Sequence, residues 1–478
     1  MSGARRQIVV VGGGIAGLGA AHRIAELVRE RNLPATLSLL EAGGRLGGTI
    51  ATEQRDGFLL ESGPDSFISE KPWALALCRR VGLEPRLLGT ADKHRTTFVV
   101  HRGRLEPLPD GFALLAPTRI RPVLCSRLFS WPGKLRMALD LVLPRAGQRR
   151  DESLGSFVRR RLGKEALERV AQPLVGGIYT ADPDRLSLAA TLPRFLQMER
   201  EHRSLIYAMW RARRNGAAGL AGSSAARWGL FVTLRGGMEE LVTTLARRLP
   251  EGAIRCGSEV AALRQDGAKW RVELGGGETL AADGVVVATP SFVTARLVRP
   301  FDPVLGERLG AIPYSSAATV SLAFHRQDIR HPLDGFGFVV PRGEKRSIIA
   351  CTFSSVKYEG RAPAGRVLLR AFVGGALQEH LLSLSDVEME ETVLREVASL
   401  LGTRASPLFT RISRHAQAMP QYLVGHLDLV EEIEGRLSRY PGLALAGSAY
   451  RGVGISDCVR GAEAAAEAVL ARSGGEGA

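Results

Sequence analysis

Three glycines near the start of the chain have the spacing of a phosphate-binding turn. Ile8–Val11 is a short β-branched run, which predicts a buried parallel strand. Gly12, Gly14 and Gly17 follow in the pattern G-x-G-x-x-G, at the start of a helical run. The first glycine permits a tight turn, the second lets the backbone approach a pyrophosphate, and the third lets the helix pack on the strand. The positive N-terminus of that helix would face the phosphates.

An acidic residue ends the next predicted strand, Leu37–Leu40. Glu41 stands where a carboxylate can accept both ribose hydroxyls of an adenosine. The order strand, glycines, helix, strand and acid favours a dinucleotide site over an ordinary glycine-rich turn. Arg45-Leu-Gly-Gly48 comes next and resembles the E-x-x-x-R-x-G-G signature of flavoproteins of the amine oxidase and protoporphyrinogen oxidase superfamily. That resemblance implies FAD as the cofactor, with Arg45 as a charge-assisted donor to the pyrophosphate.

The composition is that of a globular protein with an excess of positive charge. The 478 residues carry a formal net charge of +15, and 45% of them are hydrophobic. There is no basic stripe with interleaved aromatics, so nucleic acid is not an expected partner, whereas an anionic substrate or membrane surface stays open. The five widely spaced cysteines predict a reducing cytoplasm, with no disulfide framework and no metal site. Neither a signal peptide nor a transmembrane helix is expected.

The predicted elements indicate an α/β fold whose nucleotide domain is interrupted. The valine run Gly284–Val287 predicts a return to the parallel sheet. A second glycine-rich turn lies between a strand at Leu443–Ala449 and a helix at Ser456–Ala471, where a helix N-terminus can face the flavin. We therefore expect a Rossmann-type FAD-binding domain with a mixed-sheet substrate domain and an inserted helical domain. The expected bounds are 1–87, 233–297 and 413–478 for the FAD-binding domain, 88–232 for the mostly helical insertion, and 298–412 for the substrate-binding domain.

One segment of the insertion combines apolar and basic residues. Residues 101–161 hold 13 Lys or Arg against five Asp or Glu. Apolar residues at helical spacing beside basic ones, such as Trp131, Lys134 and Leu135, are typical of an interfacial helix. They are equally typical of an amphipathic helix packed on a core. Peripheral contact with the inner face of the cell membrane is therefore one hypothesis for this segment.

Further motifs make the chain similar, from end to end, to the protoporphyrinogen/coproporphyrinogen oxidase family. They are Gly63-Pro-Asp-Ser-Phe67, Gly177-Ile-Tyr179, His202-Arg-Ser-Leu205, Leu234-Arg-Gly-Gly237, Gly335-Phe-Gly-Phe338, Pro420-Gln-Tyr422, Gly425-His426 and Gly447-Ser-Ala-Tyr450 through Gly454-Ile-Ser-Asp457. The resemblance implies FAD contacts by Gly12, Gly13, Gly14, Ile15, Ala16, Gly17, Glu41, Ala42, Arg45, Gly63, Pro64, Asp65, Ser66, Val260, Gly447, Val453, Gly454 and Ile455. It also implies a porphyrinogen pocket lined by Gly177, Val339 and Phe372.

The sequence departs from one feature of this family. Family members specialised for protoporphyrinogen often carry an arginine just before the strand that starts here at Phe98, where it pairs with a propionate. This chain has Thr96-Thr97 there, and the enzymes of the coproporphyrin-dependent pathway also lack that arginine. Coproporphyrinogen III is therefore the favoured substrate and protoporphyrinogen IX the alternative. Arg95 is a substitute candidate for the contact with a propionate.

The resemblance implies an enzyme in which the flavin carries the chemistry. Hydride would pass from a methylene bridge of the porphyrinogen to flavin N5, and molecular oxygen would reoxidise the flavin three times. No catalytic side chain and no metal is predicted. Two rival functions stay open, a flavin amine oxidase or polyene desaturase and a non-enzymatic binding protein that has lost FAD on the same fold. A homodimer also stays open.

Overall fold

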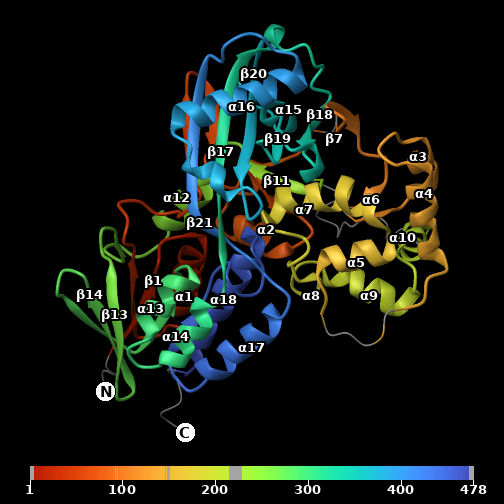
Figure 1. Cartoon of the computed structure of the whole chain (residues 1–478). Coiled ribbons are helices and arrows are strands. Elements are labelled where there is room, and N and C mark those ends of the chain that lie inside the picture. Colours follow the sequence, from red (N-terminus) through yellow and green to blue (C-terminus); the bar gives the residue numbers. More distant parts are fainter. Residues whose placement is uncertain are drawn as a thin grey trace.

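The computed structural model of the chain has three parts around two sheets. It describes residues 5–91, 93, 95–113, 115–145, 147, 151–214 and 229–472. In Figure 1 the nucleotide sheet lies at the lower left, a second and larger sheet lies at the top, and a group of helices lies at the right. The chain passes between these parts several times, as the interrupted pattern of the sequence predicted.

The nucleotide sheet has five parallel strands in the order β12-β2-β1-β16-β22. Ile8 and Val10 of the central strand face one side, and Val9 and Val11 face the other. All four are buried because the sheet is covered on both faces. The predicted strands and the predicted return at Gly284–Val287 are confirmed. The strands are β1 (Arg6–Val11), β2 (Ala35–Leu40), β12 (Ile254–Arg255), β16 (Gly284–Val287) and β22 (Leu443–Leu445).

Helices cover one face of this sheet and a small antiparallel sheet covers the other. The helices are α1 (Ile15–Glu30), α2 (Pro72–Arg80), α12 (Glu239–Arg247) and α18 (Ile455–Arg472), and their apolar sides form one core with Ile8 and Val10. The opposite face packs against β13 (Val260–Asp266), β14 (Lys269–Leu274) and β15 (Thr279–Ala282). Nearby lie α13 (Ser291–Val298), α14 (Pro303–Gly310) and α17 (His426–Leu437).

The larger sheet is mixed and has seven strands, in the order β21-β17-β20-β19-β18-β7-β8. Only the pair of β7 and β18 is parallel among its neighbouring strands. Helix α16 (Asp386–Leu401) packs its apolar side on one face. The strands are β7 (Thr96–His101), β8 (Arg104–Pro107), β17 (Tyr314–His325), β18 (Gly335–Val339), β19 (Ala350–Thr352), β20 (Arg366–Gly374) and β21 (Phe409–Pro420).

This sheet extends beyond the bounds expected for the substrate-binding domain. Residues 96–107 fall within the bounds expected for the helical insertion, but they form the hairpin β7–β8 at the edge of this sheet, where Val99 pairs with Val339. Strand β21 likewise continues past residue 412 to Pro420. Both differences have one cause, because strand pairing is decided by contacts between residues far apart in the chain, which local periodicity does not contain.

The helical part extends from α3 to α10. Ser153 caps α5, because its side chain accepts a hydrogen bond from the amide of Ser156. The helices are α3 (Ile120–Cys125), α4 (Trp131–Ala138), η2 (Leu139–Leu141), α5 (Leu154–Arg161), α6 (Lys164–Ala166), η3 (Leu167–Ala171), α7 (Gln172–Tyr179), α8 (Leu188–Thr191), α9 (Pro193–His202) and α10 (Leu205–Arg214). Connecting elements are β3 (Thr52–Arg55), β4 (Phe58–Glu61), β5 (Phe67–Ile68), η1 (Glu84–Arg86), β6 (Leu87–Gly89), β9 (Phe112–Ala113), β10 (Ala116–Pro117), β11 (Phe231–Leu234), η4 (Arg326–Asp328), η5 (Arg342–Glu344), α15 (Ser354–Lys357) and η6 (Glu379–Ser383).

Candidate active site

The first glycine-rich turn is held against Glu41 by backbone hydrogen bonds. The amide of Gly13 donates to Oε2 of Glu41 at 2.6 Å, and the amide of Gly43 donates to Oε1 at 2.7 Å. Gly12 has a φ of 104°, which favours glycine. A Cβ on Gly17 would lie 1.7 Å from the carbonyl oxygen of Gly12, so only glycine lets α1 approach β1 this closely. Each carboxylate oxygen of Glu41 keeps a second lone pair, which a ribose hydroxyl can use.

Arg45 organises the loop beside this turn. Its guanidinium donates to the carbonyl oxygens of Leu46, Gly48 and Ile50 at 3.0, 2.6 and 3.0 Å. These bonds are a role that the sequence did not indicate. A guanidinium has five N–H donors, so donors remain for a phosphate. The contact of Arg45 with a pyrophosphate stays a prediction.

The two glycine motifs lie side by side, and their geometry fits a diphosphate. The amide of Gly47 donates to the carbonyl of Gly13 at 2.8 Å, and Gly47 also forms an isolated parallel bridge with Gly14. A Cβ on Gly14 would meet no atom of the described residues within 4 Å. The first amides of α1, including those of Ile15 and Ala16, have no partner inside the helix. The chain therefore offers open space and N–H donors where a flavin nucleotide would need them.

Two more predicted cofactor contacts, Ala42 and Val260, lie near the end of the strand that precedes Glu41. Ala42 is exposed directly after Glu41. Val260, the first residue of β13, is buried in one cluster with Val11 and Leu40, the last residues of β1 and β2. Both positions therefore adjoin the end of the sheet at which the ribose would bind.

The turn after β4 is held by side chains of the larger sheet. Donors from three strands reach the carbonyl oxygen of Ser62: Oγ1 of Thr319 on β17 at 3.0 Å, Nη2 of Arg370 on β20 at 3.0 Å and Nε2 of His415 on β21 at 2.8 Å. Nη2 of Arg370 also donates to the carbonyl of Gly63. Because three strands meet at one carbonyl, the turn is fixed relative to the sheet. Gly63, Pro64, Asp65 and Ser66, the predicted flavin contacts, form this turn.

Five charged side chains surround the turn and are here called the turn cluster. Nζ of Lys357 lies 3.2 Å from Oδ2 of Asp65. Burial alone would raise the pKa of Asp65, but the positive charges of Lys357 and Arg370 outweigh it and lower the pKa to about 2. Asp65 is therefore ionised at neutral pH. The turn cluster consists of Glu61, Asp65, Lys357, Arg361 and Arg370.

The pKa of Glu61 is shifted in the opposite direction to that of Asp65. Burial raises its pKa to about 7, although the amide of Met238 and the hydroxyl of Thr52 donate to its carboxylate at 2.8 and 2.9 Å. Nη2 of Arg361 lies 4.0 Å from its Oε1. Near neutral pH the carboxyl group of Glu61 is therefore divided between its two protonation states.

The second glycine-rich turn, between β22 and α18, is held by Tyr422. The hydroxyl of Tyr422 donates to the carbonyl of Ser448 at 2.6 Å and accepts from the amide of Gly452 at 2.8 Å. His426 stacks on Tyr422 with ring centroids 3.9 Å apart, and its Nε2 lies 2.8 Å from the carbonyl of Tyr450. The Pro-Gln-Tyr and Gly-His motifs therefore support this turn, a role that their spacing did not indicate.

The predicted cofactor contacts in this turn lead into α18. Gly447 has a φ of 129°, and no atom of the described residues lies within 4 Å of where its Cβ would be. Val453 and Gly454 directly precede Ile455, the first residue of the helix. The turn thus ends at a helix N-terminus, as the sequence predicted.

Three of the four predicted substrate residues converge. A Cβ on Gly177 of α7 would lie 3.9 Å from Cγ1 of Val339 and 4.0 Å from Cβ of Ala350. Ala350 of β19 is paired with Val339 on one side and with Phe372 on the other. Gly177, Val339 and Phe372 therefore lie around Ala350, where α7 meets the larger sheet.

Arg95 lies apart from this group. It is exposed and precedes β7, and its Nη2 would lie 3.8 Å from a Cβ on Gly229. In that strand Thr96 pairs with Gly335 and Val99 with Val339, so about 13 Å of extended chain separates Arg95 from the Val339 pair. The contact of Arg95 with a propionate stays a prediction.

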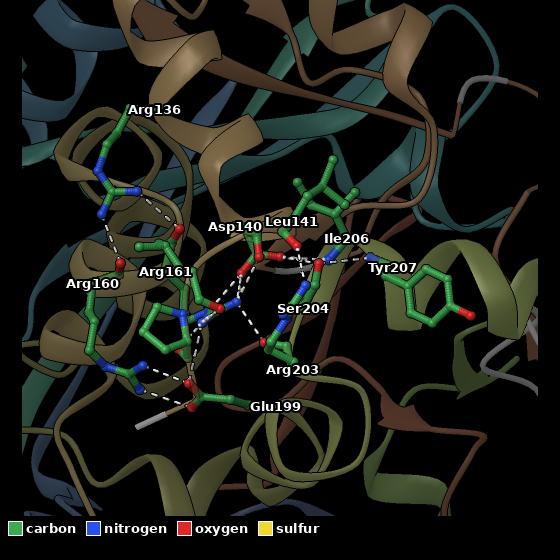
Figure 2. Close-up of polar contacts among 12 residues, drawn as sticks. Arg136, Asp140, Leu141, Arg160, Arg161, Glu199, Arg203, Ser204, Ile206 and Tyr207 are labelled. Atoms are coloured by element: carbon green, nitrogen blue, oxygen red, sulfur yellow. Dashed lines mark hydrogen bonds and ion pairs between the residues drawn. The ribbon is translucent and has the colours of Figure 1, made fainter. Parts of the chain in front are cut away.

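The His-Arg-Ser-Leu motif belongs to a buried network in the helical part (Figure 2). Arg161 and Asp140 are both fully buried, and Nε of Arg161 donates to Oδ1 of Asp140 at 2.7 Å. Oδ2 of Asp140 accepts from the hydroxyl of Ser204 at 2.7 Å and from the amide of Ile206 at 3.0 Å. Arg161 also donates to the carbonyl of Arg203 at 2.6 Å. The motif therefore joins α5, η2 and α10 and is structural.

The comparisons with known proteins agree with this geometry. The family of flavin containing amine oxidoreductases matches residues 15–470. Coproporphyrinogen III oxidase of Bacillus subtilis (strain 168) is 37% identical, over 98% of this chain and 99% of the relative. Protoporphyrinogen oxidase 1, chloroplastic, of Arabidopsis thaliana is 31% identical, over 95% of this chain and 86% of the relative. A crystal structure from Exiguobacterium sp. 255-15 has a TM-score of 0.86 and 33% identity, covering 98% and 99% of the two chains.

The chain belongs to the flavin-containing amine oxidoreductase family, and its cofactor is a flavin. The predicted α/β fold class is confirmed. The predicted likeness to coproporphyrinogen and protoporphyrinogen oxidases is confirmed as well.

Metal-ligand clusters and membrane-spanning helices are both absent from the described residues. No group of His, Cys, Asp or Glu among them could hold a metal ion. No helix among them is long and apolar enough to cross a bilayer.

Proposed function

We propose that this chain oxidises coproporphyrinogen III to coproporphyrin III in haem biosynthesis, with FAD as its flavin and molecular oxygen as the acceptor. The observation that carries the proposal is the convergence of Gly177, Val339 and Phe372 around Ala350. Phe372 is also paired with Thr319, whose hydroxyl donates to the carbonyl of Ser62 at the turn predicted to contact the flavin. The 37% identity to a coproporphyrinogen III oxidase over the full length supports the same substrate. Protoporphyrinogen IX is the alternative, supported by 31% identity to a protoporphyrinogen oxidase.

The choice of FAD follows from Glu41. FAD contains an adenosine, and Glu41 ends β2 where its carboxylate can accept the ribose hydroxyls. The turn from Gly12 to Gly17 and the N-terminus of α1 would hold the diphosphate. Gly447 and the N-terminus of α18 would face the far end of the cofactor.

The substrate residues would bind and orient the macrocycle. A porphyrinogen is broad and apolar with carboxylates at its rim, so it needs an apolar cleft with cations near the mouth. Gly177 leaves room, and Val339 and Phe372 contribute apolar surface. The net charge of +15 favours the approach of an anionic substrate. A flavin bound there would supply hydride acceptance from the methylene bridges, and three turnovers with three molecules of oxygen would remove six electrons in all, giving the porphyrin and three molecules of hydrogen peroxide.

Paired fluorescence assays would test the substrate. The purified protein, with its flavin bound, is given coproporphyrinogen III in one assay and protoporphyrinogen IX in the other. Faster porphyrin formation from coproporphyrinogen III is expected, and Thr97→Arg should move the preference toward protoporphyrinogen IX. Fluorescence from neither substrate would overturn the proposed function.

We also propose that the helical part contacts an anionic membrane surface. The helices α3, α4 and α10 lie along one outer edge of the molecule (Figure 1). Trp131 and Leu135 of α4 are 67% and 68% exposed, which is unusual for large apolar side chains. Nζ of Lys134 lies 4.8 Å from the centroid of the Trp131 ring, so a cation accompanies the apolar surface. Further exposed apolar residues are Ile120 and Leu124 of α3, Leu139 and Leu141 of η2, Val142 directly after η2, and Tyr207 and Trp210 of α10.

Co-sedimentation with vesicles would test this contact. The protein should bind phosphatidylglycerol vesicles more strongly than phosphatidylcholine vesicles, because basic residues attract anionic lipid. Leu135→Glu should reduce binding, whereas Val387→Glu, at an equally exposed apolar residue of α16, should not. If Leu135→Glu instead turned a dimer into a monomer without affecting vesicle binding, the surface would be a homodimer interface and the membrane proposal would be wrong.

A further inference from the structure

Arg370 is a buried cation without a matching carboxylate. In the turn cluster, Lys357 is paired with Asp65. Arg361 faces Glu61. Arg370 is only 4% exposed, and no described carboxylate lies within ion-pair distance of it. The turn cluster therefore contains three cations against two carboxyl groups. A buried cation with no carboxylate within ion-pair distance is costly, so such an arrangement needs a compensating function.

The guanidinium of Arg370 is aimed at the turn that precedes Asp65. Its Nη2 donates to the carbonyls of Ser62 and Gly63. Its Nε is buried and has no hydrogen-bond partner among the described residues. Thr319 and His415 bind the same carbonyl of Ser62, so the turn cannot shift without breaking bonds to three strands.

Arg370 also touches the predicted substrate wall. Its Cζ lies 5.0 Å from the centroid of the Phe372 ring. The two residues are neighbours on the same face of β20, because side chains alternate along a strand. Arg370 therefore stands between the turn predicted to contact the flavin and a residue predicted to contact the porphyrinogen.

We propose that Arg370 is a positioning residue for the flavin, which holds the turn Gly63–Ser66 against the cofactor and places an unmatched positive charge beside it. The inference rests on the proposed function of this turn as a flavin contact. A fixed cation stabilises the negative charge that comes with hydride acceptance more than it stabilises the neutral oxidised cofactor. Arg370 thereby raises the reduction potential of the bound flavin and makes it a better hydride acceptor.

Redox titration of the purified flavoprotein, without any porphyrinogen, tests the proposal. Arg370→Met should weaken binding of the reduced flavin relative to the oxidised flavin about tenfold, which lowers the two-electron potential by about 30 mV. Arg370→Lys keeps the charge and should recover part of this loss. Arg436→Met is the control: it removes an arginine outside the turn cluster, which is paired with Asp302 at 2.7 Å, and should leave the potential unchanged.

A second variant is expected to shift the potential in the opposite direction, and it keeps the proposal testable if Arg370→Met fails to fold. Asp65→Asn removes a negative charge from the turn cluster and should raise the potential. If Arg370→Lys, Arg370→Met and Asp65→Asn all kept the wild-type potential and lost only thermal stability, Arg370 would be purely structural and the proposal wrong. Failure of the proposed function would be seen separately, as a flavin-loaded wild-type protein that oxidises neither porphyrinogen.

Discussion

Two buried ionic groups of this molecule differ in whether their positive and negative charges are matched. In the helical part, Arg161 and Asp140 form one balanced pair, with Nη2 of Arg161 2.5 Å from Oδ1 of Asp140, and Oδ2 accepts two further hydrogen bonds from Ser204 and Ile206. In the turn cluster, cations outnumber carboxyl groups, and Nε of Arg370 is unpaired among the described residues. In the balanced pair, the charge and the hydrogen-bonding groups are matched within the protein, as a purely structural network requires. In the turn cluster, the charges are not matched within the protein, which favours a role toward a bound ligand.

The difference also appears in the pKa values. Glu61 and Asp65 lie four residues apart, yet burial raises the pKa of Glu61 to about 7, and the cations beside Asp65 lower its pKa to about 2 against the effect of burial. Neighbouring acids with such different values are typical of functional sites, and less so of structural ion pairs. Four substitutions test the contrast between the balanced pair and the turn cluster.

The largest effect is expected at the balanced pair. Arg161→Met leaves Asp140 buried without its cation and should cost about 3–5 kcal/mol of unfolding free energy. Asp140→Leu combined with Arg161→Met should recover part of that loss, because no isolated charge remains. Urea unfolding followed by circular dichroism measures both. A single variant within about 1 kcal/mol of the wild type would show that the pair is not structural.

Glu61→Gln should change how stability depends on pH. Glu61 has a folded pKa of about 7, raised from 4.5, so it stabilises the fold fully below pH 4.5 and progressively less as pH rises through 7. The effect is about 3 kcal/mol, and the neutral amide of the variant removes it. Unfolding free energies measured from pH 4.5 to 8 should fall in the wild type and stay flatter in the variant. Parallel curves would contradict the raised pKa.

Asp65→Asn should act in the opposite direction. The pKa of Asp65 is lowered from 3.8 to about 2, so its charge stabilises the fold above pH 3.8 and ceases to do so as pH falls through 2. The variant should be about 2 kcal/mol less stable at neutral pH, and this difference should vanish near pH 2. Acid titration of both proteins, followed by tryptophan fluorescence, measures the difference. A constant difference at all pH values would point to lost packing instead of lost charge.

The smallest effect is expected at Ser204, which caps α10 and donates to Asp140. Ser204→Ala should cost about 1–2 kcal/mol, because the amide of Tyr207 loses its acceptor and a buried carboxylate loses a donor. Ser385→Ala, which removes the exposed cap of α16, is the control and should cost less. Equal losses at the two caps, measured by thermal unfolding, would mean that the network around Asp140 adds nothing to ordinary capping.

Much of the fold was predictable from local patterns. The strand at Ile8–Val11, the glycines that follow it and the acid at Glu41 all lie as expected, because their conformations depend on neighbours in sequence. The hairpin β7–β8 also has a local turn, in which Arg102 and Gly103 both have positive φ. Its place at the edge of the seven-stranded sheet was not predicted, since pairing of Val99 with Val339 leaves no local signal.

The candidate site likewise contains residues that the sequence predicted and residues that it did not. Gly177, Val339 and Phe372 were named from the family resemblance, and the structure brings them together around Ala350. Tyr422 belongs to a recognised motif, but its two bonds to the second glycine-rich turn were not foreseen. Arg370 was not singled out at all, because an arginine inside a strand has no distinguishing spacing.

The sequence by itself determined the type of cofactor site that this protein contains. The glycine-rich turn, the acid and the motif at Arg45 are contiguous, and backbone sterics and helix polarity act over only a few residues. Only the tertiary structure decided what surrounds that site. Thr319, Arg370 and His415 meet at one carbonyl because three strands pair in one register, and a one-residue shift of any of these strands would turn its own side chain to the other face.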